Sequence, residues 1–351
     1  MKYAVLVAGG TGGHINAALA VGEALKEQGF EILYLTGKRP LDYKLFKDQK
    51  VLHINSKPLR TNNPLTLLKN IIQNFLSFFS IYFLYLKKRP KFIIGAGGYV
   101  CGPTLLAGYL QLIPVFIIEQ NAVMGLTNKI LGWFSKKIFV HFTKTKGLSS
   151  ALKAKVRVVG NPTRKSIQPV PLKSFDGELK VLVFGGSLGA TQINQVIFDL
   201  LKNPPLKNLA IHHQLGGGQK APQIPSSVNY VPMEYIDLIQ KEYEWCDVII
   251  ARAGASTVSE LAIIKKPVLI FPYPQATDNH QYYNAQIFKE ESDFTVEVLD
   301  PKLPHQEALK RVEEFLVKAS ELALKYSQTP HPGNQTCREI LREIQDHVGM
   351  A

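Results

Sequence analysis

The sequence is poor in cysteine, with three among 351 residues: Cys101, Cys246 and Cys337. Because their number is odd and they lie far apart, they exclude a disulfide framework and match no zinc-binding pattern. They are typical of reduced thiols in the cytosol. A secretory signal is also missing, since the apolar segment 2–8 is too short for a signal core and leads directly into glycines. We therefore expect a cytoplasmic protein.

Two nucleotide-binding motifs are absent as well. There is no G-x4-G-K-[ST] loop, and the dinucleotide pattern G-x-G-x-x-G fails at Gly10 and Gly12 because its third position is Ile15. The second strand leads into Thr-Gly-Lys-Arg rather than the acidic residue that would bind an adenosine ribose. Arg39 could still meet a 2′-phosphate, so a nicotinamide-dependent oxidoreductase is disfavoured but stays open. No cofactor is predicted.

Acidic residues are scarce in the first half of the chain. Residues 1–160 contain 22 basic and 6 acidic side chains, whereas residues 161–351 contain 19 and 22. The net charge of +13 therefore comes entirely from the first half. Such a one-sided field attracts a polyanion, either nucleic acid or an anionic membrane surface. No RNA-binding motif accompanies the charge, which favours the membrane surface.

The sequence does contain a strand, a glycine turn and a helix in succession. Residues 2–8 are typical of a buried strand, and Gly-Gly-Thr-Gly-Gly-His follows at 9–14. A helix is predicted to about Gln28 and a second strand at 31–36, which together make a β-α-β unit. Backbone N–H groups at such a helix N-terminus can bind an anion. Alternatively, the glycines only make a tight turn.

The same arrangement returns half a chain later. A strand is predicted at 180–184 and a helix at 192–202, and the turn between them starts 176 residues after the first turn. We therefore expect an α/β protein of two doubly wound, Rossmann-like domains. Their predicted ranges, with a shorter helical tail, are 1–160, 161–330 and 331–351.

Seven motifs spread over nearly the whole chain occur together in one known family. They are Gly-Gly-Thr-Gly-Gly-His at 9–14, Gly-Ala-Gly-Gly-Tyr-Val-Cys-Gly-Pro at 95–103, Glu-Gln-Asn at 119–121, Gly-Asn-Pro-x-Arg at 160–164, Gly-Gly-Ser-Leu-Gly-Ala at 185–190, Arg-Ala-Gly-Ala-Ser-Thr-Val-Ser-Glu at 252–260 and Asp-Asn-His-Gln-Tyr-Tyr-Asn-Ala at 278–285. In this order and combination the chain resembles the MurG family, membrane-associated N-acetylglucosamine transferases of peptidoglycan synthesis.

The resemblance implies a GT-B glycosyltransferase with a cleft between its two domains. Such an enzyme moves N-acetylglucosamine from UDP-N-acetylglucosamine to the 4-hydroxyl of the muramyl sugar of lipid I, with inversion, and makes lipid II. The first domain would take the acceptor at the membrane and the second the UDP sugar, and the tail would pack on the first domain. The enzyme would lie on the cytoplasmic face of the inner membrane, with cell-wall or division proteins as possible partners.

Two departures from the family pattern concern the acceptor side. Ile15, Asn16 and Ala17 follow the first histidine, where the family usually has an aromatic or aliphatic residue and then proline. Ile118 stands where a histidine commonly precedes Glu-Gln-Asn. A catalytic role of that histidine cannot be carried over to this chain, whereas the donor motifs are intact.

One motif supplies most of the donor contacts that the resemblance implies. They are Ala255, Ser256, Thr257, Val258, Ser259 and Glu260. Glu260 is the candidate for the ribose, because one carboxylate can accept hydrogen bonds from both hydroxyls. Alternatively, Thr257 and Glu260 form a capping box that only starts a helix.

The donor diphosphate needs cations or aligned N–H groups. Arg164 offers a guanidinium fork, and Ser187 offers a hydroxyl at a helix N-terminus. The chain contains no Asp-x-Asp motif, so no metal is predicted and these groups would stabilise the departing UDP.

Three further positions are donor candidates. Ile236 resembles the residue whose backbone meets uracil, although an ordinary buried helix residue would look the same in sequence. Gln281 lies in a predicted polar loop after a strand, where open α/β sheets bind ligands. It suits the sugar hydroxyls, unless the loop is merely solvated. Asn121 is carried over as a further sugar contact.

Displacement at the anomeric carbon needs a base for the acceptor hydroxyl. His14 is the candidate, because the helix dipole at its N-terminus disfavours a protonated ring. A capping or phosphate-binding role for His14 is an equal alternative, and Glu119 is the rival base.

Two sets of residues are candidates for binding a diphosphate. The first would bind the diphosphate of the acceptor or the departing end of the donor and comprises Thr11, Gly12 and Gly13. The second would cradle the lipid-linked diphosphate and comprises Gly97, Gly98 and Tyr99.

Residues 71–86 form a mostly apolar segment of 16 residues with basic residues on both sides. It is short of the roughly 20 residues needed to span a bilayer. Polar side chains at Gln73, Ser77 and Ser80 make a thin stripe at helical spacing, which is typical of an interfacial helix on anionic lipid. The alternatives are a crossover helix buried in the first domain, or a helix that packs inward and touches lipid along one edge.

Rival functions remain at this stage. The nearest is another GT-B transferase that glycosylates a membrane lipid such as diacylglycerol. The others are the nicotinamide-dependent oxidoreductase and a non-catalytic membrane scaffold, against which the intact donor motifs argue.

Overall fold

The computed structural model describes residues 2–171, 175–186, 189–224, 228–323 and 335–348, without the side chains of 321–323. The chain divides into two units. The first unit comprises Met1–Lys165 with Asn334–Ala351, and the second comprises Ser166–Gly333. The division falls after Lys165, whereas the sequence analysis placed the boundary after residue 160.

The first unit contains a seven-stranded parallel sheet in the order β3-β2-β1-β4-β5-β6-β7. Its strands are β1 (Lys2–Val7), β2 (Phe30–Thr36), β3 (Val51–His53), β4 (Ile93–Gly95), β5 (Val115–Glu119), β6 (Lys137–Val140) and β7 (Val156–Val158). The central strands read as near-continuous apolar runs because helices cover both faces. Chain order reverses between β1 and β4, so this pair forms the switch point of a doubly wound sheet.

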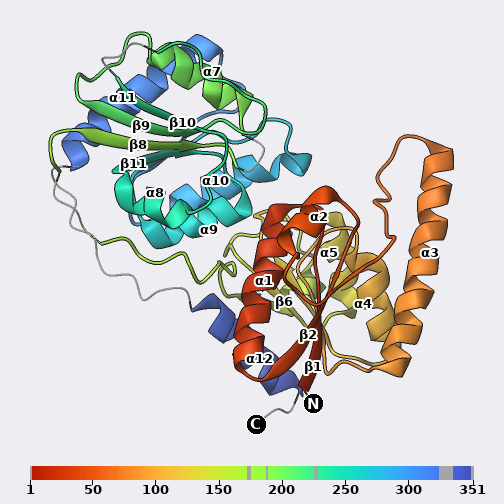
Figure 1. The fold of residues 1–351 in the computed structure, drawn as a ribbon. Coiled ribbons are helices and arrows are strands. Elements are labelled where there is room, and N and C mark those ends of the chain that lie inside the picture. Colours follow the sequence, from red (N-terminus) through yellow and green to blue (C-terminus); the bar gives the residue numbers. More distant parts are fainter. Residues whose placement is uncertain (1, 172–174, 187–188, 225–227, 324–334, 349–351) are drawn as a thin grey trace. The chain divides into compact units, whose positions relative to one another are not determined.

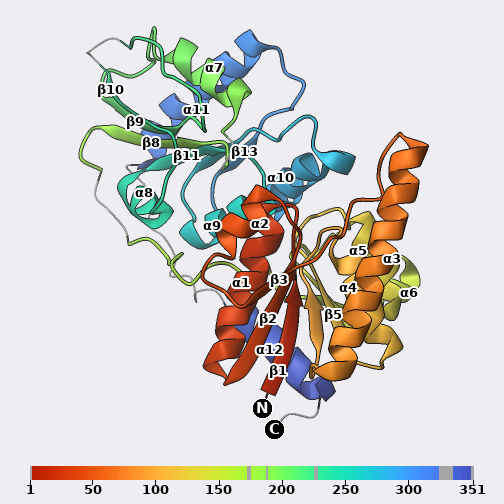
Figure 2. The ribbon, with the colours of Figure 1, turned by 45° about the vertical axis from the view of Figure 1, so that its right-hand side comes forward.

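The helices of the first unit lie on opposite faces of its sheet. They are α1 (Gly12–Glu27), α2 (Pro40–Leu45), α3 (Pro64–Lys87), α4 (Cys101–Leu110), α5 (Leu126–Leu131), the 3-10 turn Gly132–Phe134, α6 (Ser150–Lys153) and α12 (Thr336–Val348). Figure 2 shows α1 on one side of the strands and α3 and α4 on the other. Alternation along β1 fits this arrangement, since Leu6 packs in the cluster with α1 and Val5 in the cluster with α4.

The C-terminal helix α12 completes the core of the first unit. Ile340, Leu341 and Ile344 are buried in the same cluster as side chains of β1 and α1. Arg157 of β7 pairs with Glu343, at 3.1 Å from Nε to Oε1. The first unit is therefore built from both ends of the chain (Figure 1).

The second unit contains a six-stranded parallel sheet in the order β10-β9-β8-β11-β12-β13. Its strands are β8 (Leu179–Phe184), β9 (Leu209–Gln214), β10 (Asn229–Met233), β11 (Val248–Ala251), β12 (Val268–Ile270) and β13 (Val296–Val298). Its helices are α7 (Thr191–Leu200), α8 (Ile239–Trp245), α9 (Ala255–Ile264), the 3-10 turn Thr277–Asn279, α10 (His280–Glu291) and α11 (His305–Ala323). Figure 1 shows α7 and α11 on one face and α8, α9 and α10 on the other. The switch point lies between β8 and β11, and the predicted pair of doubly wound α/β sheets is confirmed.

Helix α3 is longer than predicted, with 24 residues from Pro64 to Lys87. By length and composition it could cross a membrane, so the length argument against spanning is wrong. The helix is nevertheless tied to the first unit. Asn70 Nδ2 donates to the Pro58 carbonyl oxygen at 2.8 Å, and Gln111 Nε2 of the α4 C-cap donates to the Tyr82 carbonyl oxygen at 2.8 Å. These contacts favour a helix that lies on the surface of the unit.

The apolar face of α3 points outward. The inward side consists of Asn70, Ser77, Ile81 and Tyr85, whereas most of its large apolar side chains are exposed. Those exposed by at least 47% are Leu65, Leu68, Ile71, Ile72, Phe75, Leu76, Phe83 and Leu86. The alternative of a buried crossover helix is therefore wrong for this face. We call these eight side chains the α3 apolar face.

Candidate active site

The glycine-rich loops of each unit meet at the carboxyl edge of its sheet, beside the switch point. In the first unit these are the loops after β1 and β4, and in the second the loops after β8 and β11. Open α/β sheets bind ligands at this place, because the neighbouring loops turn to opposite faces and leave a crevice.

The two loops of the first unit pack so closely that they require glycine. Gly98 has φ +92°, and a Cβ atom there would lie 2.2 Å from the Gly9 carbonyl oxygen. Gly97 has φ +105°, and its Cβ atom would lie 2.7 Å from the ring of His14. Both residues therefore serve the contact between loops, since any side chain would push the second loop off the first.

The geometry of His14 fits a proton acceptor. Its Nδ1 lies 3.2 Å from the Gly9 carbonyl oxygen. A carbonyl oxygen only accepts, so Nδ1 carries the hydrogen of the neutral ring and the lone pair is on Nε2. Thr11 caps the helix, because its Oγ1 accepts from the His14 backbone N–H at 3.4 Å, and Gly12 and Gly13 form the first turn of α1.

Glu119 holds the loop that follows β5. Its buried carboxylate accepts from Asn121 through Oε1, at 3.1 Å from N and 3.3 Å from Nδ2. Through Oε2 it accepts from Gly125 N and Asn128 Nδ2, both at 2.9 Å. Four donors on one buried carboxylate indicate a structural anchor, which counts against Glu119 as the base. One of the four donors is the Asn121 side chain, the predicted sugar contact, which is therefore bound to Glu119.

The residues that depart from the family pattern lie mostly in the core. Ile15 and Ala17 are fully buried and Ile118 is 1% exposed, and all three belong to the cluster beneath α1 and α12. Asn16 is partly exposed.

Tyr99 follows the two glycines of the second loop. Burial raises the pKa of its phenol, so the hydroxyl stays protonated at neutral pH. The structure thus brings together Thr11, His14, Gly97, Gly98 and Tyr99 at one edge of the first sheet.

In the second unit, the turn after β8 is held by its own backbone. The Gly189 N–H donates to the Gly186 carbonyl oxygen at 2.9 Å, and Gln214 Nε2 donates to the same oxygen at 3.2 Å. Gly189 has φ +74°, and a Cβ atom there would lie 2.0 Å from the Leu215 carbonyl oxygen. Ser187, the predicted diphosphate ligand of this turn, lies outside the described residues.

Helix α9 begins at Ala255, with Gly254 as its N-cap. Thr257 is therefore inside the helix, and the capping-box alternative for Thr257 and Glu260 is wrong. Ala255, Ser256 and Thr257 form the first turn, whose N–H groups have no partner within a helix. Among the described residues, the buried hydroxyl of Ser256 has no hydrogen-bond partner.

The second turn of α9 contains Val258, Ser259 and Glu260. The Ser259 hydroxyl donates back to the Ala255 carbonyl oxygen at 2.7 Å, and Val258 is fully buried. Glu260 is 6% exposed, and its Oε2 accepts from the hydroxyl of Tyr243 at 2.8 Å. This hydrogen bond fixes the direction of the carboxylate from α8, which sequence reasoning did not foresee.

Arg252 links three segments at the carboxyl edge of the second sheet. Its buried Nη1 donates to Gln192 Oε1 of α7 at 3.2 Å and to the Phe271 and Pro272 carbonyl oxygens after β12 at 3.1 and 3.2 Å. Burial lowers the pKa of Arg252 to about 10, so the side chain remains charged at neutral pH. The sequence analysis gave it no role, although it opens the motif at 252–260.

Gln281 lies in the first turn of α10, after the 3-10 turn 277–279, and not in an open loop. Its Oε1 accepts from the Tyr273 backbone N–H at 3.0 Å, which ties α10 to the segment after β12. Ile236 lies in the connection between β10 and α8, so the alternative of a helix residue is wrong, and it is 8% exposed. Arg164 belongs to the first unit, two residues before the division.

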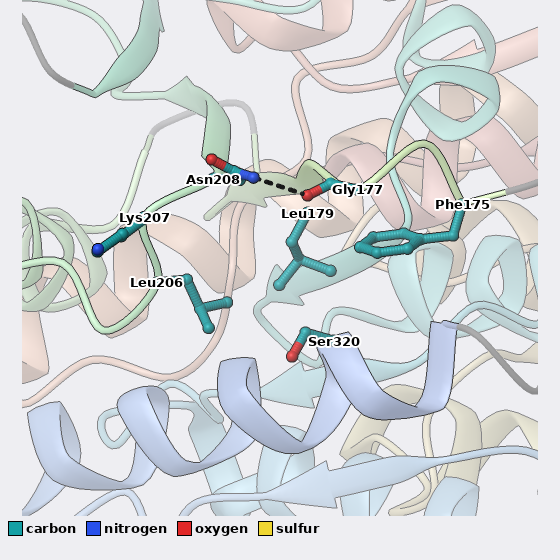
Figure 3. Close-up of a pocket in the computed structure, with 7 residues that line it drawn as sticks. All are labelled: Phe175, Gly177, Leu179, Leu206, Lys207, Asn208 and Ser320. Atoms are coloured by element: carbon teal, nitrogen blue, oxygen red, sulfur yellow. Dashed lines mark hydrogen bonds between the residues drawn. The ribbon is translucent and has the colours of Figure 1, made fainter.

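The described ranges contain no group of three His, Cys, Asp or Glu side chains placed to hold a metal ion. A cavity of about 350 Å³ lies in the second unit (Figure 3). It is lined by Phe175, Gly177, Leu179, Leu206, Lys207, Asn208 and Ser320. Leu179 starts β8 and Asn208 directly precedes β9, so the cavity lies at the amino edge of the sheet, opposite the glycine turn.

Comparison with known proteins identifies the family. The N-terminal domain model of glycosyltransferase family 28 matches residues 4–140, and the C-terminal domain model matches residues 180–325. A Psychromonas ingrahamii protein is 38% identical over 295 residues, 81% of each chain, and a Coxiella burnetii protein is 34% identical over 327 residues, 90% of each. The chain belongs to the MurG family of glycosyltransferase family 28.

Solved structures agree with membership in the MurG family. Acinetobacter baumannii MurG is 28% identical, with a TM-score of 0.75 over 99% of this chain and 100% of the other. The predicted GT-B fold and glycosyltransferase class are thereby confirmed. A UDP-GlcNAc 2-epimerase from Neisseria meningitidis shares the fold at 16% identity and a TM-score of 0.62. The fold therefore does not fix the reaction, and the motifs of the MurG family must do so.

Proposed function

We propose that this MurG-family chain transfers N-acetylglucosamine from UDP-N-acetylglucosamine to the 4-hydroxyl of the muramyl sugar of lipid I, giving lipid II with inversion. The observation that carries the proposal is the similarity over most of the chain to the Psychromonas ingrahamii and Coxiella burnetii proteins. Both are named UDP-N-acetylglucosamine--N-acetylmuramyl-(pentapeptide) pyrophosphoryl-undecaprenol N-acetylglucosamine transferase. The donor motif at 252–260, which starts α9 at the switch point, supports it.

The second unit would bind the donor at its carboxyl edge. Glu260 would accept hydrogen bonds from the ribose hydroxyls, while Tyr243 holds one carboxylate oxygen in place. The N–H groups of the first turn of α9 and the turn after β8 would face the diphosphate, where a helix N-terminus stabilises negative charge. Gln281 would contact the sugar from the start of α10.

The first unit would bind the acceptor and receive its proton. The muramyl 4-hydroxyl oxygen attacks the anomeric carbon as the bond from that carbon to the UDP oxygen breaks, and UDP leaves with the electron pair. His14 Nε2 takes the hydroxyl proton, with the ring oriented by the Nδ1 contact to Gly9. Displacement on the face opposite the leaving group inverts the anomeric centre.

The α3 apolar face would hold the enzyme on the cytoplasmic face of the inner membrane. Lys87 and Arg89 at its C-terminal end are exposed, whereas Lys88 is paired with Glu31 at 2.8 Å. Exposed aromatic and aliphatic side chains beside cations are typical of peripheral binding to anionic lipid. A lipid-linked acceptor gives such binding a purpose.

The test is UDP release from UDP-N-acetylglucosamine in EDTA, with no acceptor, with a lipid I analogue or with diacylglycerol. We expect release only with the lipid I analogue, together with a disaccharide product. Release with diacylglycerol alone would favour the rival lipid glycosyltransferase. No release, in folded protein that binds UDP, would contradict the proposed acceptor.

A further inference from the structure

Two loops of the first unit are joined by one buried carboxylate. Asp42 is fully buried in α2, and its Oδ1 accepts from the Gly10 backbone N–H at 3.3 Å. Its Oδ2 accepts from the Arg39 backbone N–H at 3.0 Å. Asp42 thus connects the turn after β2 to the glycine turn after β1.

The side chain of Arg39 extends this connection to the loop after β4. Its guanidinium carbon lies 5.0 Å from the centre of the Tyr99 ring, and its Nη1 donates to the Gly10 carbonyl oxygen at 3.3 Å. Gly37 makes room for this stack, because a Cβ atom there would lie 2.5 Å from the Tyr99 hydroxyl oxygen. Arg39 is therefore held beside both glycine loops and the switch point.

The guanidinium of Arg39 is exposed, and several of its N–H groups remain available for a ligand. Within the described part of the chain its partners are the Gly10 carbonyl oxygen and the Tyr99 side chain, which leaves several of its five N–H groups for a ligand. Its planar fork matches the oxygen atoms of a phosphate, and the contact with Tyr99 restricts the guanidinium before the ligand binds.

The proposed reaction needs a cation at this edge. A lipid-linked diphosphate carries at least two negative charges, whereas a helix N-terminus supplies roughly half a positive charge. His14 must stay neutral to accept a proton, so it cannot supply the rest.

We propose that Arg39, whose backbone N–H is held by Asp42, binds the diphosphate of the lipid-linked acceptor. The proposal rests on the proposed function, since it assigns a ligand to the acceptor side of the same site. The phosphate that Arg39 binds is thus assigned to the acceptor, and not to the donor or to anionic lipid headgroups.

The test compares wild type with Arg39→Gln, Arg39→Lys and the exposed neighbour Lys38→Gln. Steady-state kinetics are measured in detergent without anionic lipid, and again with anionic vesicles, on a lipid I analogue and on its monophosphate counterpart. For Arg39→Gln we expect the acceptor KM to rise about tenfold or more and the donor KM to stay within about twofold. The penalty should shrink on the monophosphate, Arg39→Lys should be intermediate, and Lys38→Gln should match wild type.

Several outcomes would overturn the proposal. An equal penalty on both acceptors would indicate a merely structural role, and a rise in the donor KM alone would assign Arg39 to the donor. A penalty seen only with anionic vesicles would assign it to headgroups. If wild type turns over and Arg39→Gln matches it, Arg39 binds neither diphosphate. If wild type itself makes no product, the proposed function fails and this proposal with it.

Discussion

At the scale of single residues, the structure separates two candidate bases that the sequence left as rivals. Glu119 is buried and holds four hydrogen bonds from its own loop, whereas His14 lies partly exposed at a helix N-terminus. The difference arises because Asn121, Gly125 and Asn128 fold back onto the carboxylate. Only His14 combines a defined tautomer with a place beside the glycine loops.

We expect His14→Ala to lower kcat by about 10²–10⁴, because general-base catalysis contributes on that order. The KM for UDP-N-acetylglucosamine should change little. Glu23→Ala, an exposed position on the same helix, is the matched control. Steady-state turnover with a lipid I analogue measures both constants, and near-normal kcat in His14→Ala would remove His14 as the base.

His213 is a second residue whose environment gives a prediction. Its ring is fully buried, with Nδ1 3.1 Å from the Tyr230 hydroxyl and Nε2 3.1 Å from Asn194 Oδ1. Both contacts suit the neutral ring, and burial lowers the pKa of His213 to about 3. Between that value and the ordinary histidine pKa of about 6.5, the unfolded chain binds a proton that the folded chain does not.

The stability of the second unit should therefore fall as the pH drops below about 6.5, by about 1.4 kcal/mol per pH unit from this residue alone. His213→Gln should be less stable at neutral pH but should lose less on acidification. Urea unfolding of both proteins between neutral and mildly acidic pH measures the two slopes. The exposed His347→Gln is the control, and parallel curves for wild type and His213→Gln would contradict the assignment.

At the scale of elements, α3 departs most from the ordinary pattern of an amphipathic helix. Two polar residues, Asn70 and Ser77, are buried on its inward side, and Asn70 donates a hydrogen bond within the unit. Most of its large apolar side chains face outward. Exposed apolar patches of this kind mark interaction surfaces. An anionic membrane surface is the partner that the basic first half of the chain favours.

We expect the triple variant Leu68→Ser, Phe75→Ser, Phe83→Ser to bind vesicles of phosphatidylcholine and phosphatidylglycerol at least about tenfold more weakly. These side chains are 57%, 60% and 62% exposed, so the melting temperature should stay near that of wild type. Val317→Ser, at a position 41% exposed in the second unit, is the control. Vesicle sedimentation measures the binding, and an unchanged affinity of the triple variant for vesicles would contradict the assignment of this face to lipid.

At the scale of the whole molecule, the first unit depends on the last helix of the chain. Ile344 of α12 is 1% exposed in the core beneath α1, although more than three hundred residues separate the two helices. The core of the first unit therefore combines residues from the two ends of the printed sequence.

Ile344→Ala should destabilise the first unit by about 2–5 kcal/mol, since it removes buried methyl groups and leaves a cavity. The second unit should be unaffected. Hydrogen exchange of the β1 and α1 amides, compared with that of β8 and α7, measures the two units separately. The exposed Asp346→Ala is the control, and equal loss of protection in both units would contradict the division.

The sequence by itself determined the two doubly wound sheets, the glycine turns at their first crossovers and the family. These features are local: an apolar run followed by glycines specifies a buried strand and a tight turn, whatever lies around them. The end of α1 and the start of α7 were therefore predicted within a residue.

Only the tertiary structure decided which side chains are available for chemistry. In the structure Glu119 accepts four hydrogen bonds and Thr257 lies inside α9. The α3 apolar face points outward, and Arg39 lies beside Tyr99. Burial and hydrogen bonding depend on residues distant in sequence, and a spacing pattern does not say which groups will meet. For this reason the sequence named most members of the site, while the fold decided which of them hold the loops and which can face a ligand.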